Sequence, residues 1–117
     1  MGRLVYDSDL EADFEDRLLA HLQVVIGAKL GKSESFYFSW RDSDDVGGGR
    51  TSLWLHPAIA LRFTYRAGAP ATINPEWVRR LIADSHTPGG LRISPEPAPR
   101  EPAPREAAPL RRAPAMR

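Results

Sequence analysis

The sequence predicts a small α+β domain, with an antiparallel sheet and two helices on one face of it, followed by a disordered C-terminal tail. Three observations predict this: short runs of alternating apolar and polar residues, two segments with helical periodicity, and an abrupt change of composition near residue 95. We therefore expect a single domain over residues 1–94 and a tail over residues 95–117. A domain of this size can bury one core without metals or disulfides, and the chain contains no cysteine.

The first residues alternate as strands do. Residues 4–6 and 10–14 are the first two expected strands, and the second has apolar residues at positions 10, 12 and 14 between acidic ones. Asp7 and Ser8 lie between the two segments and are expected to form the turn of a hairpin.

The clearest helical pattern follows directly. Asp13 is expected to be the N-cap residue, with Asp16 three positions later in a capping-box arrangement. The helix is expected to run to about Leu30, with Gly31 as its C′ residue. One apolar stripe has the helical period, and its members are Leu18, Leu19, Leu22, Val25, Ile26 and Leu30.

Three further strands are expected in the middle of the chain. Residues 36–41, 52–56 and 61–66 each alternate apolar and polar side chains. The first connection, residues 42–50, has acidic residues followed by three glycines, which is typical of a hairpin loop. The second connection is a short turn around Pro57.

A second helix and a last strand complete the expected domain. Asn74 followed by Pro75 is an N-cap followed by proline at the first helical position, and the helix should end near Ser85. Residues 91–94 form the last expected strand, which gives the order ββαβββαβ. The helix should direct four apolar residues to the sheet: Trp77, Val78, Leu81 and Ile82.

The tail has a repeat of its own. Residues 96–100, Glu-Pro-Ala-Pro-Arg, occur again as residues 101–105, and a degenerate copy begins at Glu106. Such a composition cannot build a core and favours solvated polyproline II. The segment is interpreted as a plain disordered extension. The alternative is a ligand for a proline-recognising or an acidic partner, because Pro99 and Pro102 have PxxP spacing.

Composition restricts the compartment and the partners. The first residues are acidic and lack an apolar run, which predicts neither a secretory nor a transit signal and favours the cytoplasm. The longest apolar stretch, residues 22–30, is interrupted and too short to span a bilayer, so we expect no membrane association. Five arginines and three glutamates lie in residues 95–117, which leaves eleven basic and twelve acidic residues in the domain. Binding to nucleic acid would therefore need a local basic patch.

Acidic and histidine residues do not form a metal or cofactor motif. Four acids alternate along the N-terminal hairpin, and three more precede the glycines of residues 47–49; a charged edge strand and a solvated loop explain both patterns. The glycines are followed by a strand instead of the helix of a phosphate-binding loop. His21, His56 and His86 lack paired spacing, so each is interpreted as a surface or structural histidine. The acids are Asp7, Asp9, Glu11, Asp13, Asp42, Asp44 and Asp45.

The sheet face opposite the helices is the candidate binding face. Alternation places aromatic and arginine side chains on it together, a combination that holds single-stranded nucleic acid by stacking and by contacts to phosphate. The alternative interpretation is that the aromatic residues pack under the first hairpin or in a dimer interface. The candidate residues are Tyr37, Arg41, Trp54, His56, Arg62 and Arg66, with Ser39 and Thr64 between them.

Several stretches carry a family resemblance over residues 1–97: residues 21–30, 34–40, 54–57, 73–77 and 90–93. On these stretches the chain resembles short bacterial proteins of unknown function that genome annotation often labels "ATP-dependent DNA ligase". The resemblance implies a fold and this label, and it implies no catalytic residues. Ligases of that type form a lysyl-adenylate at a Lys-x-Asp-Gly motif, which neither Lys29 nor Lys32 matches.

The sequence thus predicts a non-catalytic binding or protein-interaction module, with a homodimer or another protein as its partner. The first alternative is a nucleic-acid-associated accessory protein without ligase activity of its own. The second is an enzyme whose site the sequence does not reveal.

Overall fold

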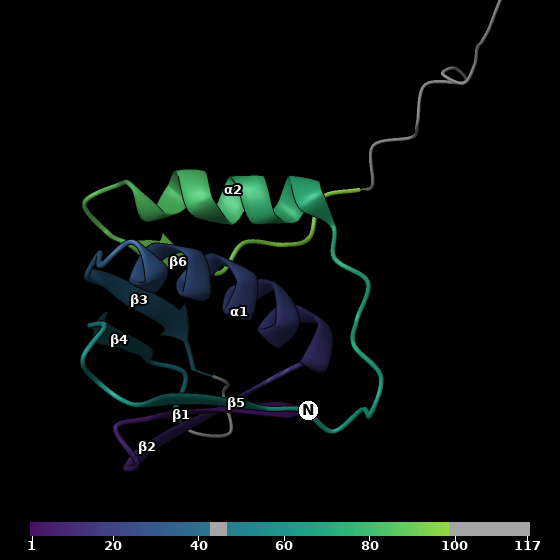
Figure 1. Cartoon of the computed structure of the whole chain (residues 1–117), viewed down its shortest axis with the longest axis horizontal. Helices are drawn as coiled ribbons and strands as arrows, with labels where there is room; N and C mark the ends of the chain where they lie inside the picture. Colours follow the sequence, from purple (N-terminus) through teal and green to yellow (C-terminus); the bar gives the residue numbers. More distant parts are fainter. Residues whose placement is uncertain (43–46, 99–117) are drawn as a thin grey trace, which may run out of the picture.

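The computed structural model describes residues 1–42 and 47–98, and within them the chain forms two helices and six strands (Figure 1). This confirms the α+β class and the order ββαβββαβ. The bounds are β1 Gly2–Tyr6, β2 Leu10–Phe14, α1 Asp16–Gly31, β3 Phe36–Arg41, β4 Arg50–Leu55, β5 Leu61–Thr64, α2 Pro75–Ser85 and β6 Leu91–Arg92.

The strands form two three-stranded sheets instead of the single expected sheet. Sheet A has the order β2-β1-β5 and sheet B the order β4-β3-β6; all pairs are antiparallel except β3 with β6. β4 and β5 are neighbours in sequence but lie in different sheets, because β5 pairs with β1 after the turn at residues 56–60. The amide of Asp7 fixes this turn by donating a hydrogen bond to the carbonyl oxygen of Ala60 at 2.9 Å.

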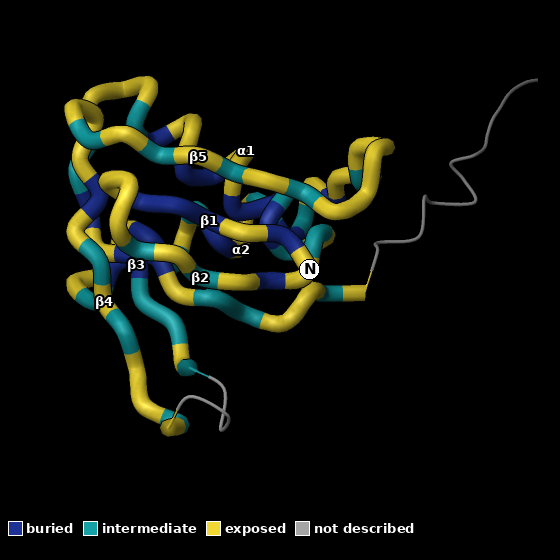
Figure 2. The backbone as a smooth tube through the Cα atoms, turned by 90° about the horizontal axis from the view of Figure 1, so that it is seen from below, coloured by how far each residue is buried: buried dark blue, intermediate teal, exposed yellow. Residues whose placement is uncertain are grey.

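One core lies between the sheets and the helices. In Figure 1, α1 lies between sheet A and α2, so both helices are on the same side of sheet A. Along much of β1 the chain is buried, whereas β4 and β5 are intermediate or exposed for most of their length (Figure 2). Every layer contributes side chains with 0 % exposure: Leu4, Leu19, Leu22, Val25, Ile26, Phe38, Leu55, Leu81 and Leu91.

The ends of α1 differ from those expected. Asp13 is not the N-cap, because β2 continues to Phe14, whose ring packs against Trp40 with centroids 5.5 Å apart. The helix begins at Asp16 without a side-chain cap, includes Gly31, and is followed by Ser33 in a left-handed conformation (φ 62°). Both ends lie further along the chain than the capping rules predicted.

The start of α2 agrees with the expectation. The side chain of Asn74 accepts a hydrogen bond from the amide of Glu76 at 3.1 Å, and Pro75 is the first helical residue. Trp77 of α2 lies against His21 of α1, with ring centroids 4.5 Å apart. This histidine is fully buried: its Nδ1 donates to the carbonyl of Arg17 at 2.7 Å, and its Nε2 accepts from the amide of Asn74 at 2.8 Å. His21 is therefore a structural histidine that joins α1 to the start of α2.

Contacts with the domain continue beyond residue 94. Trp77 Nε1 donates to the carbonyl of Ser94 at 3.0 Å, and Arg17 binds the carboxylate of Glu96. The division between domain and tail at residues 94 and 95 stays a prediction, and residues 99–117 lie outside the described part of the chain. Of the helices in the described ranges, none combines the length and apolar character needed to cross a membrane.

Candidate functional site

The outer face of sheet B carries the candidate site. Residues that pair directly across strands point to the same side of a sheet, and here Tyr37 pairs with Trp54, Ser39 with Ser52, and Arg41 with Arg50. Arg92 of β6 joins this side through its parallel pairing with Ser39. We call this surface the aromatic–arginine face, made of Tyr37, Ser39, Arg41, Arg50, Ser52, Trp54 and Arg92.

The aromatic end of this face is open. The rings of Tyr37 and Trp54 meet edge to face, with centroids 5.0 Å apart and planes at 67°. They are 49 % and 48 % exposed, although the opposite sides of their strands are buried in the core. Gly90, which directly precedes β6, packs against Tyr37: it has φ 77°, and a Cβ there would lie 2.9 Å from Tyr37 Cβ. The pair is thus held in place and still accessible.

The other end is cationic. Arg41 and Arg50 face each other at the end of the β3–β4 ladder, and the hydroxyls of Ser39 and Ser52 bond to each other at 2.8 Å in the middle of the face. A hollow of about 300 Å³ is lined by the three arginines of the face together with Ser39, Trp40 and Ile93. Within residues 1–42 and 47–98, no carboxylate forms an ion pair with Arg41, Arg50 or Arg92.

The structure brings together only part of the candidate set. Tyr37, Arg41 and Trp54 lie on one face, as the alternation indicated. His56 follows β4 directly and uses its Nδ1 to accept a hydrogen bond from the amide of Ala58 at 3.0 Å, within the turn.

Arg62 and Arg66 do not lie on this sheet. Arg62 is on β5, opposite Val5 in sheet A, and Arg66 follows β5. The sequence analysis had placed all the candidate residues on one face of a single sheet, and the pairing of β5 with β1 separates these two arginines from the aromatic pair. Whether Arg62 and Arg66 take part in binding stays untested.

Two arginines of the face were missed by the sequence analysis. Arg50 could have been found from its period-2 spacing with Ser52 and Trp54. Arg92 could not, because its place depends on a parallel pairing between segments more than fifty residues apart in sequence. Arg50 and Arg92 thus lie beside Arg41 on this face, where Arg62 and Arg66 had been expected.

Two of the four acidic residues of the N-terminal hairpin, Glu11 and Asp13, are paired with a cation. Arg3 lies 3.2 Å from Glu11 and 2.8 Å from Asp13, and its hydrogen bond lowers the pKa of the Asp13 carboxyl. Asp42 accepts hydrogen bonds from Trp40 Nε1 and from the Thr51 hydroxyl, and Asp44 and Asp45 lie outside the described residues. No group of three or more acidic or histidine side chains suited to a metal was found in the described chain.

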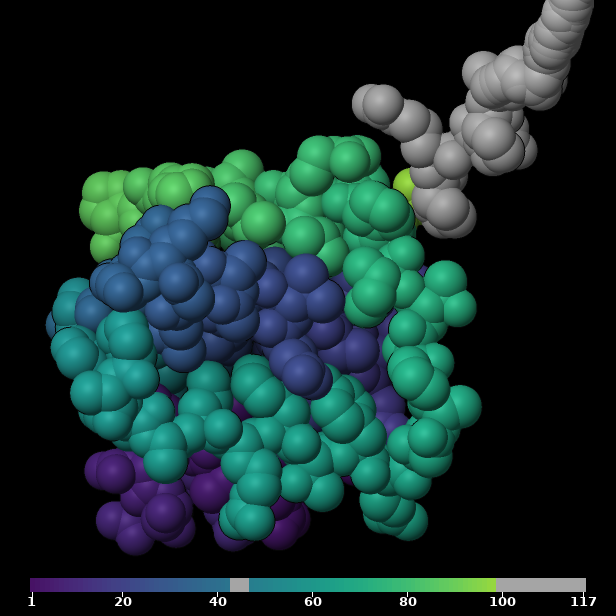
Figure 3. Space-filling model, viewed as in Figure 1, coloured from purple at the N-terminus to yellow at the C-terminus, as the bar shows by residue number. Residues whose placement is uncertain are grey.

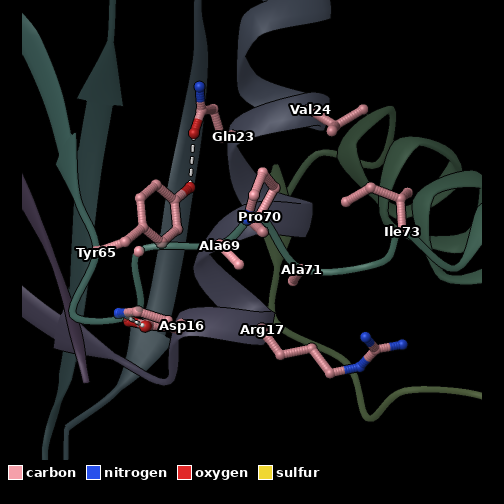
Figure 4. A pocket seen from close by; sticks show the side chains of 12 residues that line it. Asp16, Arg17, Gln23, Val24, Tyr65, Ala69, Pro70, Ala71 and Ile73 are labelled. Carbon is pink, nitrogen blue, oxygen red and sulfur yellow. Dashed lines mark hydrogen bonds between the residues drawn. The ribbon is translucent and has the colours of Figure 1, made fainter.

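A second, apolar pocket lies between α1 and the segment that joins β5 to α2. That segment runs beside α1 at the surface (Figure 3), and the close view shows Val24, Ile73, Pro70 and Tyr65 around a cavity of about 560 Å³ (Figure 4). Its polar groups have internal partners: the Tyr65 hydroxyl donates to Gln23 at 2.6 Å, and Asp16 accepts from the amides of Ala67 and Arg66. The amide of Ala67 lowers the pKa of Asp16, and burial raises the pKa of Tyr65. These contacts hold the segment in place.

Comparison with known proteins identifies the family and nothing beyond it. No curated protein and no solved structure matches the chain. A family model described as "Domain of unknown function (DUF7882)" matches residues 1–96, which includes all the strands and helices described above. The chain belongs to the DUF7882 family.

Proposed function

We propose that the domain is a non-catalytic binding module of the cytoplasm that holds a protein partner, either a second copy or another protein, on the aromatic–arginine face. The observation that carries the proposal is the exposed pair of Tyr37 and Trp54. Aromatic residues and arginine are the types enriched at the centres of protein interfaces.

The energetics support a binding role for this pair. An aromatic side chain offers about 150–250 Å² of surface, and Tyr37 and Trp54 leave about half of theirs in water. At about 25 cal/mol per Å², covering the remainder yields about 2–3 kcal/mol for each ring. β4 is an edge strand of sheet B, so a partner can also pair with its backbone.

Single-stranded nucleic acid is the second candidate, and it is favoured by Arg41, Arg50 and Arg92, which form no ion pair with a carboxylate in the part of the chain that the structure describes. Bases stack on exposed rings while guanidinium groups meet phosphates, and this face places Arg41 and Arg50 four residue pairs along the β3–β4 ladder from the aromatic rings. The proposal includes no ligase activity: Lys29 is 6 % exposed, donates to Glu34 at 2.8 Å and lies 5.0 Å from the ring centroid of Phe36.

The two candidates can be separated with one set of variants. Tyr37→Ala combined with Trp54→Ala removes the aromatic end, and Arg41→Ala with Arg50→Ala removes the cationic end. Arg79→Ala combined with Arg80→Ala on α2 is the matched control for the loss of two exposed arginines.

Sedimentation velocity over a hundredfold range of concentration measures self-association, and fluorescence anisotropy with single-stranded DNA and RNA at two salt concentrations measures nucleic-acid binding. A mass that rises with concentration and is lost in the aromatic variant supports the protein candidate. Binding that falls steeply with salt and is weakened by both double variants supports the nucleic-acid candidate. Equal effects of the control and of either double variant would remove the aromatic–arginine face from the proposal.

A further inference from the structure

The chain binds one of its own glutamates, Glu96, through residues of α1 and of the start of α2. Arg17 forms a bidentate contact with the carboxylate of Glu96: Nε donates to Oε1 at 2.8 Å and Nη2 to Oε2 at 2.5 Å. Arg17 is itself oriented by Nη1, which donates to the carbonyl of Thr72 at 2.8 Å. Two parallel bonds of this kind are the geometry in which arginine recognises a carboxylate most specifically.

Asn74 contacts both Glu96 and the residue that follows it. Its Nδ2 donates to Glu96 Oε2 at 3.0 Å and to the carbonyl oxygen of Pro97 at 3.2 Å. The contacts with Arg17 and Asn74 lower the pKa of Glu96 to about 2, so the bound carboxyl is ionised near neutral pH. The site therefore recognises a carboxylate and the next backbone carbonyl.

The chain carries this ligand twice. Residues 96–100 and residues 101–105 are identical, so Glu101 and Pro102 offer the same carboxylate and the same following carbonyl. Glu106 begins a third, degenerate copy in which alanine replaces the proline.

We propose that Arg17 and Asn74 form a recognition site for a Glu-Pro step, and that Glu101-Pro102 of the same chain is its alternative ligand. Trp77 holds the carbonyl of Ser94. If Glu101 takes the place of Glu96, the six residues 95–100 form the loop between Ser94 and the bound glutamate. Loops of this length close at small entropic cost, and the prolines in it add stiffness. Glu96 is therefore the main ligand, and Glu101 binds when Glu96 is removed.

The test follows the Arg17 Nε–H signal by nuclear magnetic resonance in Glu96→Ala, in Glu96→Ala with Glu101→Ala, and in Glu96→Ala with Glu106→Ala. The first and third variants should keep slow exchange of this proton. The second should exchange about tenfold faster, because a bond to a charged group is lost. Equal exchange in the first two variants overturns the proposal. The Trp77 indole signal reports whether each variant is folded.

A peptide makes the same test without the tether. The double variant Glu96→Ala/Glu101→Ala is titrated with an acetylated, amidated Glu-Pro-Ala-Pro-Arg peptide and with a control peptide in which glutamine replaces glutamate. A saturable shift of the Arg17 signal with the first peptide alone is expected. Equal response to both, or no response, overturns recognition of the carboxylate. A Glu96→Ala protein that protects Arg17 only as a dimer overturns binding within one chain.

Discussion

The outer faces of the two sheets are built by the same alternation, but they differ in how their charges are balanced. On sheet A, Arg3 lies between Glu11 and Asp13 and pairs with both. On sheet B, Arg41 lies directly opposite Arg50. Like charges opposite each other across strands destabilise a sheet. On sheet A, Arg3 is thus balanced by two carboxylates, whereas Arg41 and Arg50 of sheet B form no ion pair with a carboxylate of residues 1–42 and 47–98, in line with the proposed binding face.

The aromatic residues of the two sheets make the same contrast. Tyr6 and Phe14 of sheet A are buried in the core, at 9 % and 7 % exposure. Tyr37 and Trp54 of sheet B remain about half exposed. Sheet A thus directs Tyr6 and Phe14 to the core, whereas sheet B, besides its core-facing Phe36 and Phe38, carries two aromatic residues on its outer face, where burial by a partner would release further free energy.

The largest effect on stability is expected at Gly90, where β6 joins sheet B. β6 pairs with β3 over two residues only, and Gly90 precedes it with φ 77° and no room for a Cβ beside Tyr37. Gly90→Ala should therefore lower the free energy of unfolding by about 2–4 kcal/mol, from backbone strain and overpacking. Urea denaturation measures this change in the free energy of unfolding. Gly68→Ala is the control, since nothing lies within 4 Å of its Cβ position, and equal losses for the two variants would contradict the explanation.

A smaller effect is expected at the bond that joins the sheets. The Tyr6 hydroxyl donates to the carbonyl of Trp54, and burial raises the pKa of Tyr6. Tyr6→Phe should cost about 0.5–1.5 kcal/mol at neutral pH, with Tyr37→Phe as the exposed control.

The pH dependence of Tyr6→Phe has a definite sign. A tyrosine whose folded pKa is raised stabilises the fold fully below the unfolded value of about 10 and loses this contribution as the pH rises above it. Stability curves at pH 7 and pH 11 should therefore show the wild type losing its advantage over Tyr6→Phe. A constant difference would mean that the hydroxyl does not titrate with unfolding.

Much of the fold was accessible from the sequence because strands and helices are local patterns. The alternation at residues 36–41 and the Asn74-Pro75 pair predicted β3 and the start of α2. Pairing partners were not accessible, because the choice of β5 between β1 and β4 depends on packing across the whole chain. Capping at Asp13 failed for a related reason: burial of Phe14 extends β2 past the residue that local rules favour.

The candidate site divides in the same way. Tyr37, Arg41 and Trp54 were found because one hairpin places them on one side. Arg92 was missed because a strand of two residues carries almost no alternation signal. Glu96 was assigned to the tail by composition, and its partner Arg17 is 79 residues away in sequence.

The acid limb of the stability curve should separate the two faces. Because Arg3 lowers the pKa of Asp13, this carboxylate stabilises the fold above its unfolded pKa of about 3.9 and loses that contribution as the pH falls below it. The difference in melting temperature between wild type and Arg3→Ala should shrink from pH 7 to pH 2. For Arg41→Ala the difference should stay constant, because no carboxylate of the described chain pairs with Arg41. Parallel behaviour of the two variants would erase the contrast between the sheets.

The smallest expected effect comes from giving sheet B the charge pattern of sheet A. Arg41→Glu places a carboxylate opposite Arg50 in the β3–β4 ladder, and such a cross-strand pair stabilises by about 0.2–1 kcal/mol. Arg41→Gln is the control that removes the like-charge contact without adding an ion pair. Urea denaturation at low salt should order the variants Arg41→Glu, Arg41→Gln and wild type from most to least stable. Arg41→Glu should also weaken the binding of an anionic ligand more than Arg41→Gln does. A variant that is both less stable and weaker in binding would mean that Arg41 is already balanced in the folded domain.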